Sequence, residues 1–132
     1  MKRLLFLGLI SSMLFGACQV TPEYPLDILQ GKWRRIGSTD PSADSMEIYI
    51  QNDSGVISYV PTTTTFTVGT VKWDNITSIA VNANFEMLDY SIDEQGIKTY
   101  LDLYINGDTT LELENQNYRN APGGIQTWVK IP

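Results

Sequence analysis

The acidic side chains are the residues of this sequence whose chemistry first suggests catalysis. A pair of carboxyl groups can hydrolyse a glycosidic bond when one acts as the acid and the other as the base or nucleophile. Most acidic residues here fall on turns or on the polar phase of alternating segments, where carboxylates are usually solvated. We therefore interpret them as a solvated surface. The residues considered are Asp44, Glu47, Asp89, Asp93, Glu94, Asp102, Glu112 and Glu114.

Other catalytic arrangements lack their essential residues. The sequence contains no histidine, which is the commonest general base and the commonest metal ligand. It has no Gly-x-Ser-x-Gly segment and no acidic run that matches a calcium loop. The single cysteine excludes an intrachain disulfide and a cysteine-based zinc site. We expect a protein without enzymatic activity, cofactor or metal.

The charge of the chain argues against nucleic acid as a partner. Nine Lys and Arg residues stand against fifteen Asp and Glu residues, which gives a net charge of −6 over 132 residues. Two of the basic residues, Lys2 and Arg3, lie in the N-terminal leader, so the rest of the chain is more acidic still. Phosphate binding needs a face rich in Lys and Arg. The length suits one globular domain.

Residues 1–17 have the layout of a secretory signal peptide, with a basic start, an apolar run and small residues before Cys18. The apolar run is shorter than the ~20 residues that span a bilayer. Residues 14–18 resemble a bacterial lipobox, which implies that the Cys18 sulfur receives a diacylglyceryl group and that cleavage occurs before it. Acyl chains there would anchor the protein to a membrane. Residues 18–27, with Pro22 and Pro25, are expected to form a tether.

Gln19 bears on the membrane to which the protein is attached. In enterobacterial lipoproteins an aspartate at this position retains the protein in the inner membrane. By the same resemblance, Gln19 implies the outer membrane of a Gram-negative bacterium. The protein would face either the periplasm or the cell surface.

The remaining sequence predicts short antiparallel strands. Alternation is clearest in residues 46–51, where Met46, Ile48 and Ile50 share one face. Asn106-Gly107 is a specific hairpin signal. Strands are predicted at 29–36, 46–51, 56–60, 62–73, 77–82, 84–91, 98–105, 110–114 and 126–131.

Irregular segments are expected between and within these strands. Residues 37–45 and 115–124 are predicted loops, 73–76 a bend, 93–96 a hairpin turn, and Met87-Leu88 the site of a bulge. Strands at this spacing predict an all-β fold for residues 28–132, a small antiparallel up-and-down barrel of about eight strands that follows the signal peptide.

The first and last predicted strands resemble those of lipocalin-like barrels. The resemblance rests on Gly31-Lys32-Trp33 near the start and on Lys130 within the last strand. It implies that the Trp33 indole plugs the narrow end of the barrel. It also implies that the basic side chain of Lys130 packs over that indole.

The inward positions suggest two functions. The residues expected inside are bulky and apolar, and an eight-stranded barrel either is filled by such side chains or holds one small ligand. The first hypothesis is a non-catalytic carrier of a small apolar or amphipathic molecule. The alternative is a filled barrel that binds an envelope protein or a glycan, such as a hydrolase inhibitor, through its loops and a tyrosine face. The inward set is Met46, Ile48, Ile50, Leu101, Leu103, Ile105, Leu111, Leu113, Val129 and Ile131. The ligand-lining set is Trp33, Met46, Ile48, Phe66, Phe85 and Leu103, and the partner face is Tyr49, Tyr100 and Tyr104.

Overall fold

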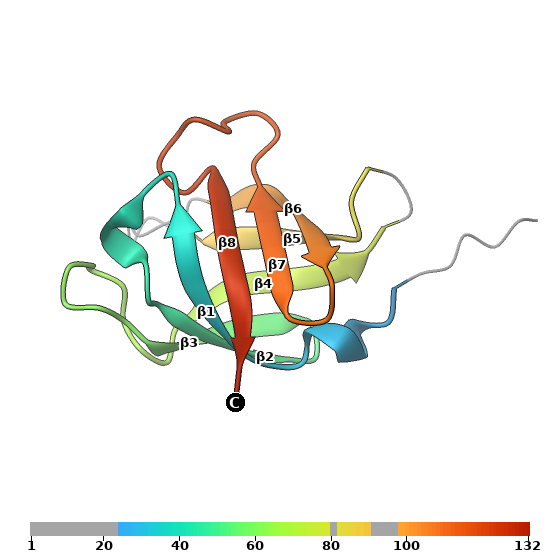
Figure 1. Cartoon of the computed structure of the whole chain (residues 1–132), viewed down its shortest axis with the longest axis horizontal. Helices are drawn as coiled ribbons and strands as arrows, with labels where there is room; N and C mark the ends of the chain where they lie inside the picture. Colours follow the sequence, from blue (N-terminus) through green and yellow to red (C-terminus); the bar gives the residue numbers. More distant parts are fainter. Residues whose placement is uncertain (1–23, 80–81, 91–97) are drawn as a thin grey trace, which may run out of the picture.

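The computed structural model describes residues 24–79, 82–90 and 98–132. In these residues the chain forms a closed barrel in which each strand pairs antiparallel with the next and β8 pairs with β1 (Figure 1). The predicted all-β, up-and-down barrel is therefore confirmed. The strands are β1 (Gly31–Ser38), β2 (Glu47–Gln51), β3 (Ser54–Tyr59), β4 (Val71–Ser78), β5 (Phe85–Tyr90), β6 (Lys98–Asn106), β7 (Thr110–Glu114) and β8 (Ile125–Ile131).

Two single turns of 3₁₀ helix accompany the strands. The first, η1 (Leu26–Leu29), leads into β1, and the second, η2 (Pro41–Ala43), lies in the loop between β1 and β2. The described residues contain no helix that is long and apolar enough to cross a membrane. The predicted signal peptide and Cys18 lie outside the described residues, as does the hairpin turn at 93–96.

The central part of the sequence folds differently from the prediction. Residues 61–70 form a loop between β3 and β4, where a strand was expected. The expected bend at 73–76 lies inside β4, where Asn75 has a φ of 54° and the pairing with β5 shifts between Asp74 and Thr77. The strand thus continues through an irregularity. The predicted bulge at Met87-Leu88 is wrong, because β5 pairs with β6 in unbroken register.

The hairpin at Asn106-Gly107 is confirmed. Asn106 pairs with Thr110, and Gly107 has a φ of 70°. Glycine adopts this left-handed conformation without the steric cost of a Cβ. The turn joins β6 and β7 at the same end of the barrel as η1 (Figure 1).

Three tryptophans lie in the packed interior of the barrel. The rings of Trp73 and Trp128 meet edge to face with their centres 4.7 Å apart. The indole N–H of Trp33 donates to the carbonyl oxygen of Leu29 at 2.7 Å, which joins the first strand to η1. The Nζ atom of Lys130 lies 5.4 Å from the centre of the Trp33 ring, so the expected packing of a basic side chain over this indole is confirmed.

Most of the predicted inward residues are buried, but in the last strand the side chains predicted to point outward point inward. Gln126 and Trp128 point inward, whereas Val129 and Ile131 are only half-buried. The register explains the difference, because Lys130 pairs with the inward-facing Trp33 and antiparallel partners share a face. Ile105 packs against the core from a half-buried position. The fully buried members of the predicted set are Met46, Ile48, Ile50, Leu101, Leu103, Leu111 and Leu113.

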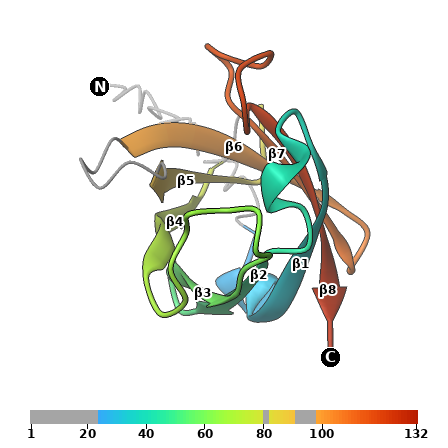
Figure 2. The same ribbon diagram turned by 90° about the vertical axis from the view of Figure 1, so that its left-hand side faces the viewer.

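Three loops gather at one end of the barrel. They are the β1–β2 loop with η2, the 61–70 loop and the 115–124 loop between β7 and β8. Figure 2 turns this end toward the viewer, with the 61–70 loop and η2 in front. We refer to it as the mouth.

Candidate functional site

The mouth contains a pocket of about 490 Å³. Strand ends and all three mouth loops contribute to its wall, and buried charged side chains lie among apolar ones. The residues that line it are Arg35, Asp40, Ala43, Phe66, Lys72, Asp89, Thr99, Leu101, Asn115, Tyr118, Ala121, Pro122, Gly123, Gly124 and Gln126.

Arg35 is the first of the buried charges. It follows Trp33 by two residues in β1, so it has the same inward phase and is only 4% exposed. Its Nε donates to Asp44 Oδ1 at 3.1 Å, and its Nη2 donates to the carbonyl oxygen of Asp40. Burial lowers the pKa of Arg35, and the Asp44 carboxylate opposes that shift. Through these two hydrogen bonds the guanidinium connects strand β1, at the inner wall of the pocket, to the loop that contains η2.

Lys72 and Asp89 form a second buried ion pair. Asp89 continues the inward phase of Phe85 and Met87 in β5, and Lys72 lies on the neighbouring strand β4. The Lys72 ammonium donates to Asp89 Oδ1 and, at 2.6 Å, to the carbonyl oxygen of Tyr90. Burial raises the pKa of the Asp89 carboxyl, and the Lys72 charge opposes the rise. The interpretation of Asp89 as a solvated carboxylate was therefore wrong.

The Lys72 ammonium also contacts the 61–70 loop. Its Nζ lies 4.9 Å from the centre of the Phe66 ring. The cation and the ring attract each other. A charged group and an apolar wall therefore meet on the same side of the pocket.

The side chain of Gln126 makes two hydrogen bonds. Its Nε2 donates to the carbonyl oxygen of Gly123 at 2.9 Å, and its Oε1 accepts from the indole N–H of Trp128 at 3.1 Å. The amide thus links the packed interior to the loop above it. Gln126 is itself buried and is one of the residues that line the pocket.

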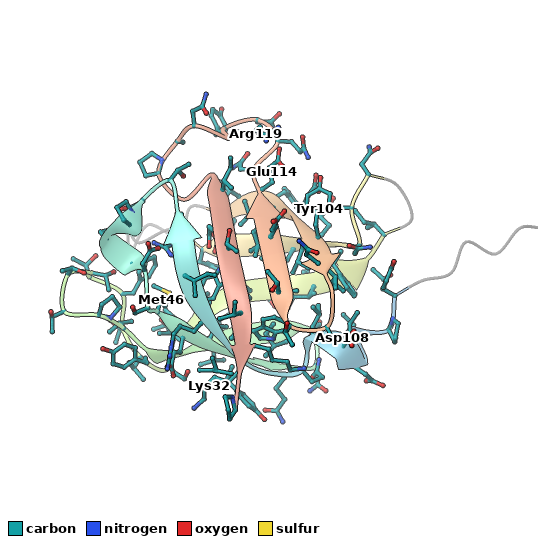
Figure 3. All side chains as sticks on the ribbon, in the orientation of Figure 1. Lys32, Met46, Tyr104, Asp108, Glu114 and Arg119 are labelled. Carbon is teal, nitrogen blue, oxygen red and sulfur yellow. The ribbon has the colours of Figure 1, made fainter. Side chains whose placement is uncertain are left out.

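The 115–124 loop is folded on itself above the pocket. The N–H of Asn115 donates to the carbonyl oxygen of Gly124 at 2.8 Å, and Asn115 Oδ1 accepts from the N–H of Tyr118 at 3.1 Å. Arg119 pairs with Glu114 at 2.9 Å, and Figure 3 shows the two side chains together at the top of the barrel. These contacts fix the shape of this part of the pocket wall.

The predicted ligand-lining residues mostly do not reach this pocket. Of the six, only Phe66 lines it. The other five are fully buried in the core, and Trp33 also borders a second pocket of about 150 Å³ at the opposite end of the barrel. The core residues are Trp33, Met46, Ile48, Phe85 and Leu103.

The sequence did contain a signal for the polar residues that the prediction missed. Arg35, Asp89 and Gln126 each lie two positions from a buried apolar residue on the same strand. A charged or amide side chain that continues an apolar phase is a candidate for an internal polar site.

The three predicted partner-face tyrosines do not form one surface. Tyr49 lies on β2, whereas Tyr100 and Tyr104 lie on β6, four strands away around an eight-stranded ring. Tyr49 and Tyr100 are exposed, and the Tyr104 hydroxyl accepts from Gln116 Nε2 at 3.0 Å. In Figure 3 Tyr104 lies on the outside of the barrel.

Two of the other acidic residues, Asp102 and Glu114, are register partners on β6 and β7, and Glu114 is paired with Arg119. Glu47 pairs with Arg34 at 2.6 Å on the outer surface. Asp93 and Glu94 lie outside the described residues. Within the described ranges, no group of three or more acidic or cysteine side chains is placed to hold a metal ion.

Comparison of the chain with protein-family models, with characterised proteins and with solved structures gave no match.

Proposed function

We propose that this chain is a membrane-anchored, non-catalytic lipoprotein that binds one small amphipathic molecule in the mouth pocket. The observation that carries the proposal is the pocket of about 490 Å³, lined both by buried charges and by apolar side chains. Ligand sites in proteins commonly measure roughly 300–1,000 Å³ and combine apolar walls with a few polar groups. The lipobox-like segment ending at Cys18 supports the membrane anchor, and Gln19 supports the outer membrane of a Gram-negative bacterium.

The packing of the interior indicates how deep the ligand reaches. Trp73 and Trp128 occupy the barrel below the pocket, and both are fully buried. A ligand would therefore sit among the mouth loops. The lipocalin-like first and last strands, joined by the contact between Lys130 and Trp33, support a carrier of this general type.

An outer-surface feature favours a second candidate function, the binding of a protein or a glycan. Tyr49 pairs with Val56, and Val56 pairs with Val71, so the three side chains form a row across β2, β3 and β4. Tyr49 and Val71 are exposed. Aromatic and aliphatic side chains on a flat β surface suit contact with a partner.

The experiment is native mass spectrometry of the full chain after incubation with a lipid extract of bacterial envelopes. We expect an adduct of roughly a few hundred daltons, the size of ligand that such a pocket encloses. Thr99→Trp, which places an indole at a half-buried position of the pocket wall, should abolish the adduct.

The matched control is Thr109→Trp. Thr109 is exposed in the turn between β6 and β7, at the opposite end of the barrel from the pocket, so its variant should keep the adduct. An adduct that survives Thr99→Trp, or no adduct on the unaltered chain, would refute the carrier proposal.

A further inference from the structure

Arg35 has hydrogen-bonding capacity that the protein does not use. A guanidinium carries five N–H donors. One donor on Nε binds the Asp44 carboxylate, and one on Nη2 binds the carbonyl oxygen of Asp40. Among the residues that the structure describes, the other three donors have no acceptor. Because Arg35 is buried and lines the pocket, a bound molecule could supply one.

The charges around the pocket disfavour an anionic ligand. Arg35 pairs with Asp44, and Lys72 pairs with Asp89. The pocket wall also contains Asp40. Each cation therefore already has its own carboxylate. A ligand carboxylate or phosphate would add negative charge beside three others, and it would lose its hydration on entering.

The apolar part of the wall indicates the rest of the ligand. Ala43 and Leu101 are buried, and the half-buried Phe66 completes the wall from the 61–70 loop. Burial of apolar ligand surface against these side chains favours binding. These side chains therefore suit a ligand that is mostly hydrocarbon.

Building on the proposed function, we propose that the ligand is uncharged, a mostly apolar molecule with a carbonyl or another neutral acceptor to which Arg35 donates. A neutral acceptor uses the unengaged N–H groups without adding charge. The same arrangement makes the pocket selective, because it discriminates against the acid of the same carbon skeleton. Arg35 thus supplies the donors for the neutral acceptor, and the carboxylates around it disfavour the acid.

Competition on the unaltered full chain tests this selectivity. The fluorescent probe is 1-aminoanthracene, and the competitors are decanamide and sodium decanoate at pH 7, which have the same carbon skeleton. We expect decanamide to displace the probe at a concentration about tenfold lower than decanoate, because the carboxylate would lose its hydration and add charge beside the three carboxylates around the pocket.

The outcomes separate the two proposals. If decanoate displaces the probe as well as decanamide does, the ligand class is wrong and the pocket remains a binding site. If the probe shows no fluorescence increase with the protein, the pocket does not bind apolar molecules and both proposals fail.

Paired substitutions test the role of Arg35. Arg35→Met with Asp44→Asn removes the donors and keeps the charge balanced, so the affinity for decanamide, calculated from the displacement with each variant's own affinity for 1-aminoanthracene, should weaken about tenfold. The matched control is Arg34→Met with Glu47→Gln, which removes the exposed ion pair on the outer surface of the barrel. Equal weakening in both pairs would overturn the role of Arg35. The ligand comparison on the unaltered chain decides the ligand class even if the first pair fails to fold.

Discussion

The ammonium group of Lys130 lies 5.4 Å from the centre of the Trp33 ring and donates to the carbonyl oxygen of Ile28 at 3.2 Å. Trp33 and Lys130 are also register partners in the β1–β8 ladder. The side chain therefore connects the first strand, the last strand and the helical turn η1. It lies where the barrel closes, at the end opposite the mouth.

Lys130→Met should lower the free energy of unfolding by about 1–2 kcal/mol, because it removes the cation–π contact and the hydrogen bond to Ile28. Methionine keeps much of the apolar stem of the side chain, so lost packing contributes little. Urea unfolding measures the change.

Two variants control for this prediction. Lys130→Arg retains a cation over the ring and should recover most of the stability. Lys32→Met removes one positive charge from the residue that precedes Trp33. Its free energy of unfolding should stay within about 0.5 kcal/mol of that of the unaltered protein. An equal loss for both methionine variants would show that net charge, and not the contact with Trp33, sets the effect.

Gly124→Ala should destabilise the protein through the 115–124 loop. A Cβ at this position would lie 2.1 Å from the carbonyl oxygen of Tyr118 and 2.6 Å from that of Arg119. The backbone would have to shift, which costs about 1–3 kcal/mol. Urea unfolding should show this loss, and binding of 1-aminoanthracene should weaken because the loop forms part of the pocket wall.

Gly37→Ala is the matched control, because a Cβ there would meet no atom within 4 Å. It should leave both unfolding and probe binding unchanged. If Gly124→Ala behaves in the same way, the loop tolerates rearrangement and does not fix the shape of the pocket.

The fold was predictable because local patterns specified most strands. Alternation at Met46, Ile48 and Ile50 indicated both the strand and its buried face. Alternation gave the wrong buried face for β8. Trp128 and Val129 are neighbours with side chains on opposite faces, so both faces of this strand carry apolar residues, and only the pairing with β1 turns Trp128 inward. Alternation also failed at 73–76, where the pairing of β4 with β5 extends the strand through a sequence typical of turns.

The pocket was less predictable than the fold because its polar groups pair over long sequence distances. Lys72 and Asp89 are 17 residues apart and meet only when β4 and β5 align. Periodicity treats a charged residue as exposed, so a carboxylate that is neutralised across strands is assigned to the wrong face. The predicted lining residues, such as Leu103, were instead core residues, because bulky apolar side chains fill the barrel below the mouth.

Replacing both members of the buried pair, Lys72→Met with Asp89→Leu, should leave stability within about 1 kcal/mol of the unaltered protein or raise it. Apolar side chains of similar volume avoid the cost of desolvating two charges, and such replacements are often neutral or stabilising. Urea unfolding measures the change.

The single variants should behave differently from the pair. Lys72→Met or Asp89→Leu alone leaves one buried charge without its partner and should cost about 3–5 kcal/mol. Single losses that simply add in the double variant would contradict the interpretation of Lys72 and Asp89 as a coupled pair.

Asp40 should make part of the stability depend on pH. Hydrogen bonds from Ser42, through its hydroxyl and its backbone N–H, hold the pKa of Asp40 below the ordinary value of 3.8. Because the pKa is lower in the folded state, the stabilising contribution is fully present above pH 3.8 and is lost as the pH falls through the folded pKa. Asp40→Asn keeps an acceptor oxygen for Ser42 but lacks the charge, so it should lower the free energy of unfolding at pH 6 by less than the ~1 kcal/mol that loss of a helix cap typically costs.

The difference between the unaltered protein and Asp40→Asn should shrink when urea unfolding is repeated at pH 3, because protonation removes the charge that asparagine lacks. Ser42→Ala provides the control, since it removes the hydroxyl and keeps the backbone N–H that donates to Asp40 Oδ1 at 3.0 Å. It should show a smaller dependence of the same sign. Since Asp40 also supplies the carbonyl oxygen that accepts from Arg35, a difference that stays constant between pH 6 and pH 3 would mean that Asp40 acts through loop geometry and not through its charge.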